Sequence, residues 1–215
     1  HFGSLEAVRA EKLSVLEAVE PGGWAIVPGD QLDVLLEAKA RIGPAVRLMT
    51  FGMSEQCGIQ ATELRRQGTT TLLRIRDVAG DFSIPLPGQH NVENALAALA
   101  CAQALGVPLA SCQEPLAHVQ GLPMRSEVIH HNGFLILNDC YNANPLSFAR
   151  ALEVLRDLEV RRRVVIAGDM LELGASAPAA HQAIGRLAAR AGAELIVAIG
   201  AFAGDIAQGA SEAGA

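Results

Sequence analysis

The sequence contains few cysteines, and their spacing excludes the disulfide framework that small secreted proteins use. The 215 residues include four of them, Cys57, Cys101, Cys112 and Cys140, without a C-x-x-C pair. This pattern predicts reduced thiols and therefore a cytoplasmic protein. Cys140 also lacks the basic sequence neighbour that would indicate a nucleophile.

The chain has no long apolar run and no cluster of positive charge. Its longest apolar stretch, Ala95 to Leu109, is interrupted by Gln103 and is shorter than the roughly 20 residues that cross a bilayer. Lys and Arg total 17 against 23 Asp and Glu, which gives a net charge of -6. We therefore expect no membrane span and no nucleic-acid partner, because nucleic-acid backbones are bound through clustered basic residues.

Two further absences concern phosphate and metal chemistry. The only lysines are Lys12 and Lys39, and neither stands in a G-x-x-x-x-G-K-[ST] loop. A complete phosphate-transfer site is therefore not expected within this chain. The histidines lack metal-ligand spacing such as H-x-x-x-H. His181 stands among apolar and small residues, and we expect it to be a satisfied helix-face residue rather than a ligand.

The composition is that of a globular protein with two small domains. Half of the residues are hydrophobic and 19% are charged. The length favours two domains, and we place the boundary at Gly121-Leu122-Pro123, which separates residues 1–123 from 124–215. The chain begins with His1 and runs at once into a helical pattern, so we expect it to be part of something longer.

Periodicity in the first domain predicts a parallel sheet unit followed by a hairpin. Helices are expected over residues 4–19, 31–40, 91–105 and 109–119, strands over 24–27 and 45–50, and a β-hairpin over 69–78 and 81–86. The strand-helix-strand order at the start indicates parallel strands.

The second domain alternates between strands and helices. Strands are expected over residues 127–130, 134–137, 164–167 and 195–199, and helices over 147–158 and 178–190, with a final helical start. This alternation predicts a doubly wound α/β sheet that stops after a few strands and so is incomplete at its end.

Ligands of open α/β sheets bind beyond the carboxyl ends of strands, and two polar segments occupy such places. Asn138 to Pro145 follows one strand, with Asn144 able to cap and Pro145 able to start the next helix. Gly168 to Gly174 follows another. Such a helix N-terminus can hold an anion or a hydroxyl-rich ligand, although both segments could also be ordinary polar turns.

Three polar residues, two at the start of a predicted helix and one just past the predicted boundary, are candidates for nucleotide contacts. Asn91 and Asn94 stand at the start of a helix, where an amide can read a purine edge, although Asn91 could equally cap that helix. Arg125 could reach a phosphate across an interdomain cleft, or could simply be solvated.

Together these segments resemble the Mur ligase family. His1 to Lys12 is similar to its F-G-S-L segment and lysine-bearing helix, and Gly88 to Ala98 to its H-N-x-x-N-A-L-A-A helix. Asp139 to Ser147 resembles D-S-Y-N-A-N-P-x-S, and Gly168 to Gly174 matches G-D-M-x-E-L-G, with His181 at the expected distance. The last two motifs in this order are highly specific, whereas a lone H-N-x-x-N is not.

The resemblance implies an α/β chain made of the second half of a P-loop-type central ATP-binding domain and the first part of a Rossmann-like C-terminal domain. It implies an ATP- and Mg²⁺-dependent ligase, closest to the branch that adds D-alanyl-D-alanine to UDP-N-acetylmuramoyl-tripeptide, and a monomer. The chain would lack the N-terminal domain, the P-loop and the end of the C-terminal domain, and is expected to be inactive alone. Alternatives are a sibling ligase, a folylpolyglutamate synthase-like ligase, or a non-catalytic nucleotide-binding module.

The resemblance also implies roles for individual residues. Asn94, with Asn91 nearby, would face adenine, Asp139 would accept from the ribose hydroxyls, and Arg125 would approach the phosphates. The loop that carries Tyr141, Asn142 and Asn144 would orient the nucleotide and the incoming amine. Lys12, as a carbamate, would hold magnesium in the intact enzyme and would be unmodified in this chain.

Helical periodicity adds a geometric expectation for Lys12. At about 100° per residue it falls within the stripe formed by Leu5, Val8, Val15, Leu16 and Val19, which predicts that its side chain points inward. Desolvation would then favour the neutral amine that adds carbon dioxide, although a lysine on an apolar face usually only snorkels.

Overall fold

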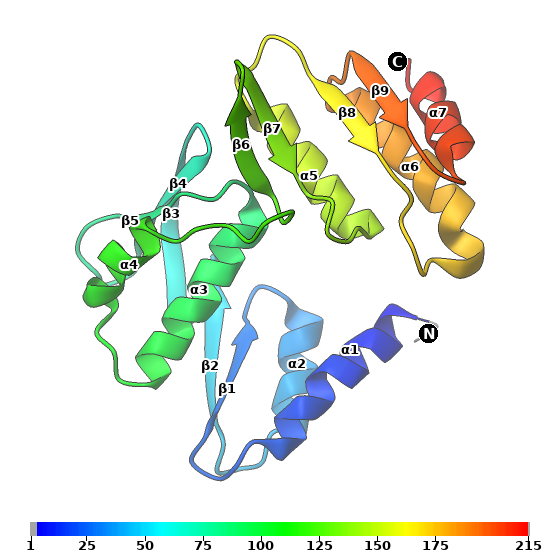
Figure 1. Ribbon diagram of the computed structural model, residues 1–215. Coiled ribbons are helices and arrows are strands. Elements are labelled where there is room, and N and C mark those ends of the chain that lie inside the picture. The colour runs from blue at the N-terminus through cyan, green and yellow to red at the C-terminus, as the bar shows by residue number, and fades with distance from the viewer. Residues whose placement is uncertain (1–3, 215) are drawn as a thin grey trace. The chain divides into compact units, whose positions relative to one another are not determined.

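The computed structural model describes residues 4–214 (Figure 1). These residues fall into two units, each with its own apolar core. The first unit holds the described residues up to 85 together with 90–119. The second holds residues 86–89 and those from 120 onward. No helix in the described range is long and apolar enough to cross a membrane.

The first unit is built on a five-stranded mixed sheet in the order β1-β2-β3-β4-β5. Its strands are β1 (Trp24–Pro28), β2 (Arg47–Gly52), β3 (Ile59–Gln67), β4 (Thr70–Ile75) and β5 (Phe82–Ile84). β1, β2 and β3 are parallel, whereas β3, β4 and β5 are antiparallel neighbours. The predicted parallel unit and hairpin are confirmed. β3 was not expected, because most of its outer half is exposed and polar and shows no apolar alternation.

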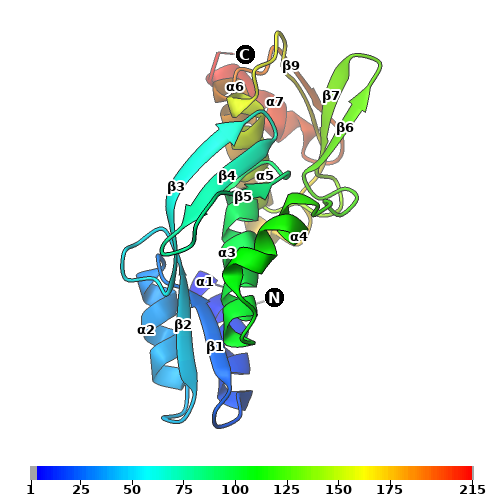
Figure 2. The same ribbon diagram turned by 90° about the vertical axis from the view of Figure 1, so that its left-hand side faces the viewer.

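Helices flank the parallel strands of this sheet. Those beside the parallel strands are α1 (Leu5–Leu13), its 3-10 continuation η1 (Ser14–Ala18), α2 (Leu32–Arg41) and α3 (Gln89–Ala104). The short η2 (Leu109–Cys112) and α4 (Gln113–Ala117) follow, and α4 contacts β5. Two views show α3 on one side of β1 and β2, with α1 and α2 on the other (Figures 1 and 2). Ser4 caps α1 as expected, because its Oγ accepts the N–H of Ala7 at 3.2 Å.

The predicted inward orientation of Lys12 is wrong. Lys12 is exposed, and so are Leu5 and Val15, at 83% and 65% of their surface. The buried residues of this segment are Leu13 and Leu16, which pack on β1 and α2. The helix changes from α to 3-10 after Leu13, so a constant step of 100° does not describe the segment.

The second unit alternates between strands and helices as predicted. Its elements are β6 (Glu127–His131), β7 (Phe134–Asn138), α5 (Pro145–Asp157), β8 (Val164–Ala167), the short η3 (Gly174–Ser176), α6 (Ala177–Arg190), β9 (Leu195–Ala198) and α7 (Ala203–Glu212). β6 and β7 are antiparallel, and β8 and β9 are parallel. The α/β class is therefore confirmed.

Helices cover one face of the β8–β9 pair. Inward residues such as Val165 and Ala167 pack with α5, α6 and α7 in one core. The opposite face carries Ile166, which is 72% exposed, and its register partner Val197. Within the described range the four strands of this unit form two two-stranded sheets, β6–β7 and β8–β9, rather than one doubly wound sheet.

Candidate functional site

Two carboxylates at the ends of β6 and β7 hold the linker, residues 122–126, which precedes β6. The antiparallel register places Glu127 opposite Asn138, so the start of β6 lies beside the end of β7. Glu127 Oε2 accepts the N–H of Met124 at 2.9 Å and the side-chain amide of Asn138 at 3.1 Å. Asp139 Oδ1 accepts the N–H of Ser126 at 2.7 Å. Sequence reasoning selected Asp139 but missed Glu127 and Ser126.

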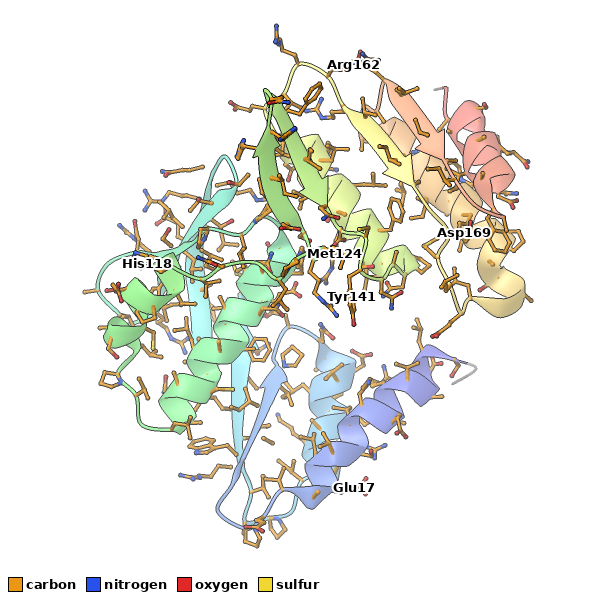
Figure 3. The ribbon with its side chains drawn as sticks, viewed as in Figure 1. Glu17, His118, Met124, Tyr141, Arg162 and Asp169 are labelled. Carbon is orange, nitrogen blue, oxygen red and sulfur yellow. The ribbon has the colours of Figure 1, made fainter. Side chains whose placement is uncertain are left out.

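Arg125 and Tyr141 form a stacked pair next to this carboxylate cluster. The Arg125 Cζ atom lies 4.3 Å from the centroid of the Tyr141 ring, and both residues are exposed. The Tyr141 N–H donates to the Met124 carbonyl oxygen at 3.1 Å, and Figure 3 shows these two residues at the end of β7. In the described part of the chain the Arg125 guanidinium has no hydrogen-bond acceptor, so its donors can take an anion.

The residues after Tyr141 lead directly into α5. Asn144 caps this helix, because its Oδ1 accepts the N–H of Ser147 at 2.9 Å and the Ser147 hydroxyl accepts the N–H of Asn144 at 3.0 Å. The predicted cap and the start of the helix at Pro145 are confirmed. Asn142 is exposed. Any contact of Asn142 or Asn144 with a ligand stays a prediction.

The two candidate adenine-reading amides lie in α3, where the helix begins at Gln89. Asn91 is half-buried and Asn94 is exposed, and both stand near the start of the helix. Asn91 is therefore inside the helix rather than at its cap. Asn91 and Asn94 belong to the first unit, whereas Arg125, Asp139 and Tyr141 belong to the second.

The second predicted polar segment, after β8, is fixed by a carboxylate. Asp169 accepts the N–H groups of Ala201 at 2.8 Å and Phe202 at 3.0 Å, which follow β9. These two bonds stabilise the anion and lower the pKa of Asp169. A Cβ atom at Gly200, where φ is +114°, would lie 2.5 Å from this carboxylate, so the close approach requires glycine.

His181 supports the same segment from α6. It is fully buried, its Nε2 accepts the Met170 N–H at 2.8 Å, and its Nδ1 lies 2.7 Å from the Ala177 carbonyl oxygen. Its ring stacks on Phe202 with centroids 4.5 Å apart. The prediction that His181 is a satisfied structural residue is confirmed.

Another carboxylate, Asp30, fixes the loop after β2 in the first unit. It accepts the N–H groups of Met53 at 2.6 Å and Ser54 at 2.9 Å. Burial alone would raise the pKa of Asp30, but the hydrogen bonds from this loop outweigh it and lower the pKa. Asp30 was not among the predicted site residues, and it serves the fold here.

The residues present do not form a magnesium site by themselves. Among residues 4–214 no group of three or more His, Cys, Asp or Glu side chains could hold a metal ion. Lys12 is exposed on α1 and has no such group around it. Its role as a metal ligand stays a prediction.

Comparisons with known proteins cover nearly the whole chain. Residues 1–102 match the Mur ligase middle domain, and residues 124–215 match the Mur ligase glutamate ligase domain. The UDP-N-acetylmuramoyl-tripeptide–D-alanyl-D-alanine ligase of Escherichia coli is 33% identical over 202 residues, which are 93% of this chain and 44% of that protein. The chain thus spans about half the length of the curated relatives it matches.

Solved structures show the same likeness in three dimensions. A crystal structure of MurF from Acinetobacter baumannii matches with a TM-score of 0.85 and 32% identity, over 98% of this chain and 46% of that one. The fold also matches MurF ligase from Thermotoga maritima in complex with ADP, with a TM-score of 0.81 and 21% identity over 95% of this chain and 47% of that one. The two domain matches and these relatives agree, and the chain belongs to the Mur ligase family.

Proposed function

We propose that this chain is the nucleotide-contacting part of a ligase that joins D-alanyl-D-alanine to UDP-N-acetylmuramoyl-tripeptide in cytoplasmic peptidoglycan precursor synthesis. The single observation that carries the proposal is the site at the end of β7. There the unpaired guanidinium of Arg125 lies on the ring of Tyr141, and the N–H of the next residue, Ser126, donates to the carboxylate of Asp139. Identity to a D-alanyl-D-alanine-adding ligase at 33% supports the choice of substrate.

The reaction in this proposal forms one amide bond at the expense of one ATP. The peptide carboxylate attacks the γ-phosphorus, so that ADP leaves and an acyl phosphate forms. The amine of D-alanyl-D-alanine then attacks the acyl carbon, inorganic phosphate leaves, and the amine loses a proton. Both steps bring anions together, so cationic and hydrogen-bonding groups must offset the developing charge.

The residues of this chain contribute binding and orientation to that reaction. Asp139 Oδ2 accepts no hydrogen bond within the described residues, so it is available to a ribose hydroxyl. The guanidinium of Arg125 can donate to phosphate oxygens. Asn94 and Asn91 would contact the adenine, and the Tyr141–Asn144 loop would orient the nucleotide and the amine. Lys12 as a carbamate and magnesium remain part of the proposal through the family resemblance alone.

The test uses the full-length protein encoded by the gene. Purified enzyme is incubated with ATP, magnesium and UDP-N-acetylmuramoyl-tripeptide, and is offered D-alanyl-D-alanine, L-alanine or glutamate in parallel. We expect product only with D-alanyl-D-alanine. A product with another amine would indicate a sibling ligase or a folylpolyglutamate synthase-like ligase, and the absence of any product would refute the proposal.

A matched pair of arginine substitutions tests the site itself. Arg125→Ala should raise the KM for ATP by roughly ten- to a hundredfold, because a charged hydrogen bond to phosphate is lost. Arg162→Ala, at an exposed position of the same unit, should leave the KM unchanged. If the KM for ATP of Arg125→Ala equals that of the wild type, Arg125 does not contact the nucleotide.

A further inference from the structure

The linker is held in an unusual backbone conformation. Met124 and Ser126 have φ values of +60° and +49°, although neither is glycine. Residues other than glycine rarely adopt positive φ, and they persist there only where surrounding contacts compensate the strain. The compensating contacts are the two N–H groups donated to Glu127 and Asp139, at 2.9 Å and 2.7 Å.

These contacts determine where Arg125 lies. The clamped residues stand directly before and after it, and the Met124 carbonyl accepts the N–H of Tyr141 at 3.1 Å. The same tyrosine provides the ring on which the guanidinium stacks. The direction of the Arg125 side chain is therefore a consequence of the backbone on both sides of it.

We infer that Glu127 and Asp139 are positioning residues, whose carboxylates together clamp the linker and set Arg125 against Tyr141. The inference rests on the proposed function for what Arg125 then binds, namely a nucleotide phosphate. Asp139 acts twice, because Oδ1 holds the Ser126 N–H while Oδ2 is available to the ribose. Glu127 acts only through the linker and touches no ligand.

The alternative is an ordinary turn in which these carboxylates happen to accept N–H groups. Two features argue against it. Each carboxylate is bonded to a residue with positive φ, and the two residues flank the one arginine of the linker. Ser126 is also buried, at 6% exposure, whereas Arg125 between the two clamped positions is exposed. The clamp thus holds Ser126 in a buried position and leaves the Arg125 side chain exposed to solvent.

The first test measures the clamp in this 215-residue chain and does not depend on function. Trypsin cleaves after Arg125 only when the linker opens, and the fragment masses identify that cut. Asp139→Ala and Glu127→Ala should speed this cleavage by roughly ten- to a hundredfold, because each removes a charged acceptor. Asp139→Asn should speed it by less than Asp139→Ala, because its amide oxygen can still accept the Ser126 N–H although the charge is lost. Glu153→Ala, an exposed carboxylate on α5, is the control.

Hydrogen exchange in the wild-type protein tests the clamp even if an alanine variant fails to fold. Hydrogen exchange of the Met124 and Ser126 amides should be slower than that of the Asn142 amide, which lies in the neighbouring exposed loop. Unprotected Met124 and Ser126 amides, or wild-type cleavage rates in folded Asp139→Ala and Glu127→Ala, would overturn the clamp.

The second test asks whether the clamp serves the nucleotide. In the full-length enzyme, Glu127→Ala should weaken ADP binding by roughly three- to tenfold, and this loss should vanish in an Arg125→Ala background, because both act through one guanidinium. An open linker with unchanged ADP affinity would overturn the positioning role while the ligase assignment stands. No effect of Arg125→Ala itself would instead refute the proposed nucleotide contact, and the cleavage rates would still report on the clamp.

Discussion

A pair of glycine substitutions on one helix tests the packing of α7 against α6. Gly209 faces α6 so closely that an added Cβ would overlap the Gln182 carbonyl oxygen and lie 2.7 Å from its carbon. Gly185 on α6 makes the reciprocal approach, with an added Cβ 2.8 Å from the Ala210 nitrogen. Gly204, near the start of α7, has no atom within 4 Å of such a Cβ. Gly209→Ala and Gly204→Ala therefore make the same chemical change in opposite environments.

The magnitudes follow from the atoms that the new methyl group meets. Overpacking costs up to about 3 kcal/mol, and the upper end applies at Gly209 because a backbone carbonyl cannot rotate away. The helix propensity of alanine over glycine returns about 1 kcal/mol, which leaves a loss of about 2 kcal/mol. At Gly204 only the gain remains, so the free energy of unfolding should rise by about 0.5–1 kcal/mol.

Urea unfolding followed by circular dichroism gives these free energies, and the unit that responds can be identified by hydrogen exchange. Exchange should accelerate in the α6 and α7 peptides of Gly209→Ala and stay unchanged in the β1–β5 sheet. Trp24, the one tryptophan of the chain, reports separately on the first unit. A Gly209→Ala variant at least as stable as Gly204→Ala would refute the close helix contact.

Three further substitutions test other contacts. Arg163 donates to three carbonyl oxygens at the end of α5, at 2.8–3.0 Å, so Arg163→Ala should cost about 1–3 kcal/mol of unfolding free energy in urea, with Arg162→Ala nearly neutral. The pKa of Asp169 is lowered in the fold, so its stabilising effect should be complete above its ordinary value of 3.8 and disappear as the pH falls through the lowered pKa. Acid unfolding should therefore show the gap between wild type and Asp169→Asn closing below that pH. Lys12→Ala should leave the unfolding free energy within about 0.5 kcal/mol because Lys12 is exposed, yet should abolish ligation by the full-length enzyme.

The fold could be predicted from sequence wherever an apolar pattern coincides with a clear start or stop. The strand over 164–167 has the predicted bounds, and α5 begins where Asn144 and Pro145 indicate. The strand over 59–67 escaped prediction because its outer half runs along the sheet with mostly exposed polar residues. The inward orientation of Lys12 was wrong for a different reason. The stripe that contained it joined α-helical residues to residues of the 3-10 segment, and its members Leu5 and Val15 are themselves exposed, so the stripe is not the buried face of the helix.

The residues of the candidate site also differ in this respect. Those that follow from a local sequence pattern could be predicted, whereas those that depend on tertiary contacts could not. The rule that ligands bind beyond strand ends selected Asp139 and the segment after β8 without any structure. Glu127 could not be selected, because its role depends on the register that places it beside the end of β7. The positive φ of Met124 and Ser126 is equally invisible in a sequence, since neither residue type indicates it.

This division bears on how substitutions in the family's motif should be interpreted. Asp139 lies in the motif and would be read as a ligand residue, yet one of its oxygens already holds the linker. Loss of activity in Asp139→Ala would therefore not separate a ribose contact from a displaced Arg125. Asn at the same position can keep the acceptor for Ser126 and loses the charge, whereas Glu127→Ala releases the linker and spares every proposed ligand atom. Comparing Asp139→Asn with Glu127→Ala therefore shows whether a loss of activity comes from the ribose contact of Asp139 Oδ2 or from the linker contact of Asp139 Oδ1.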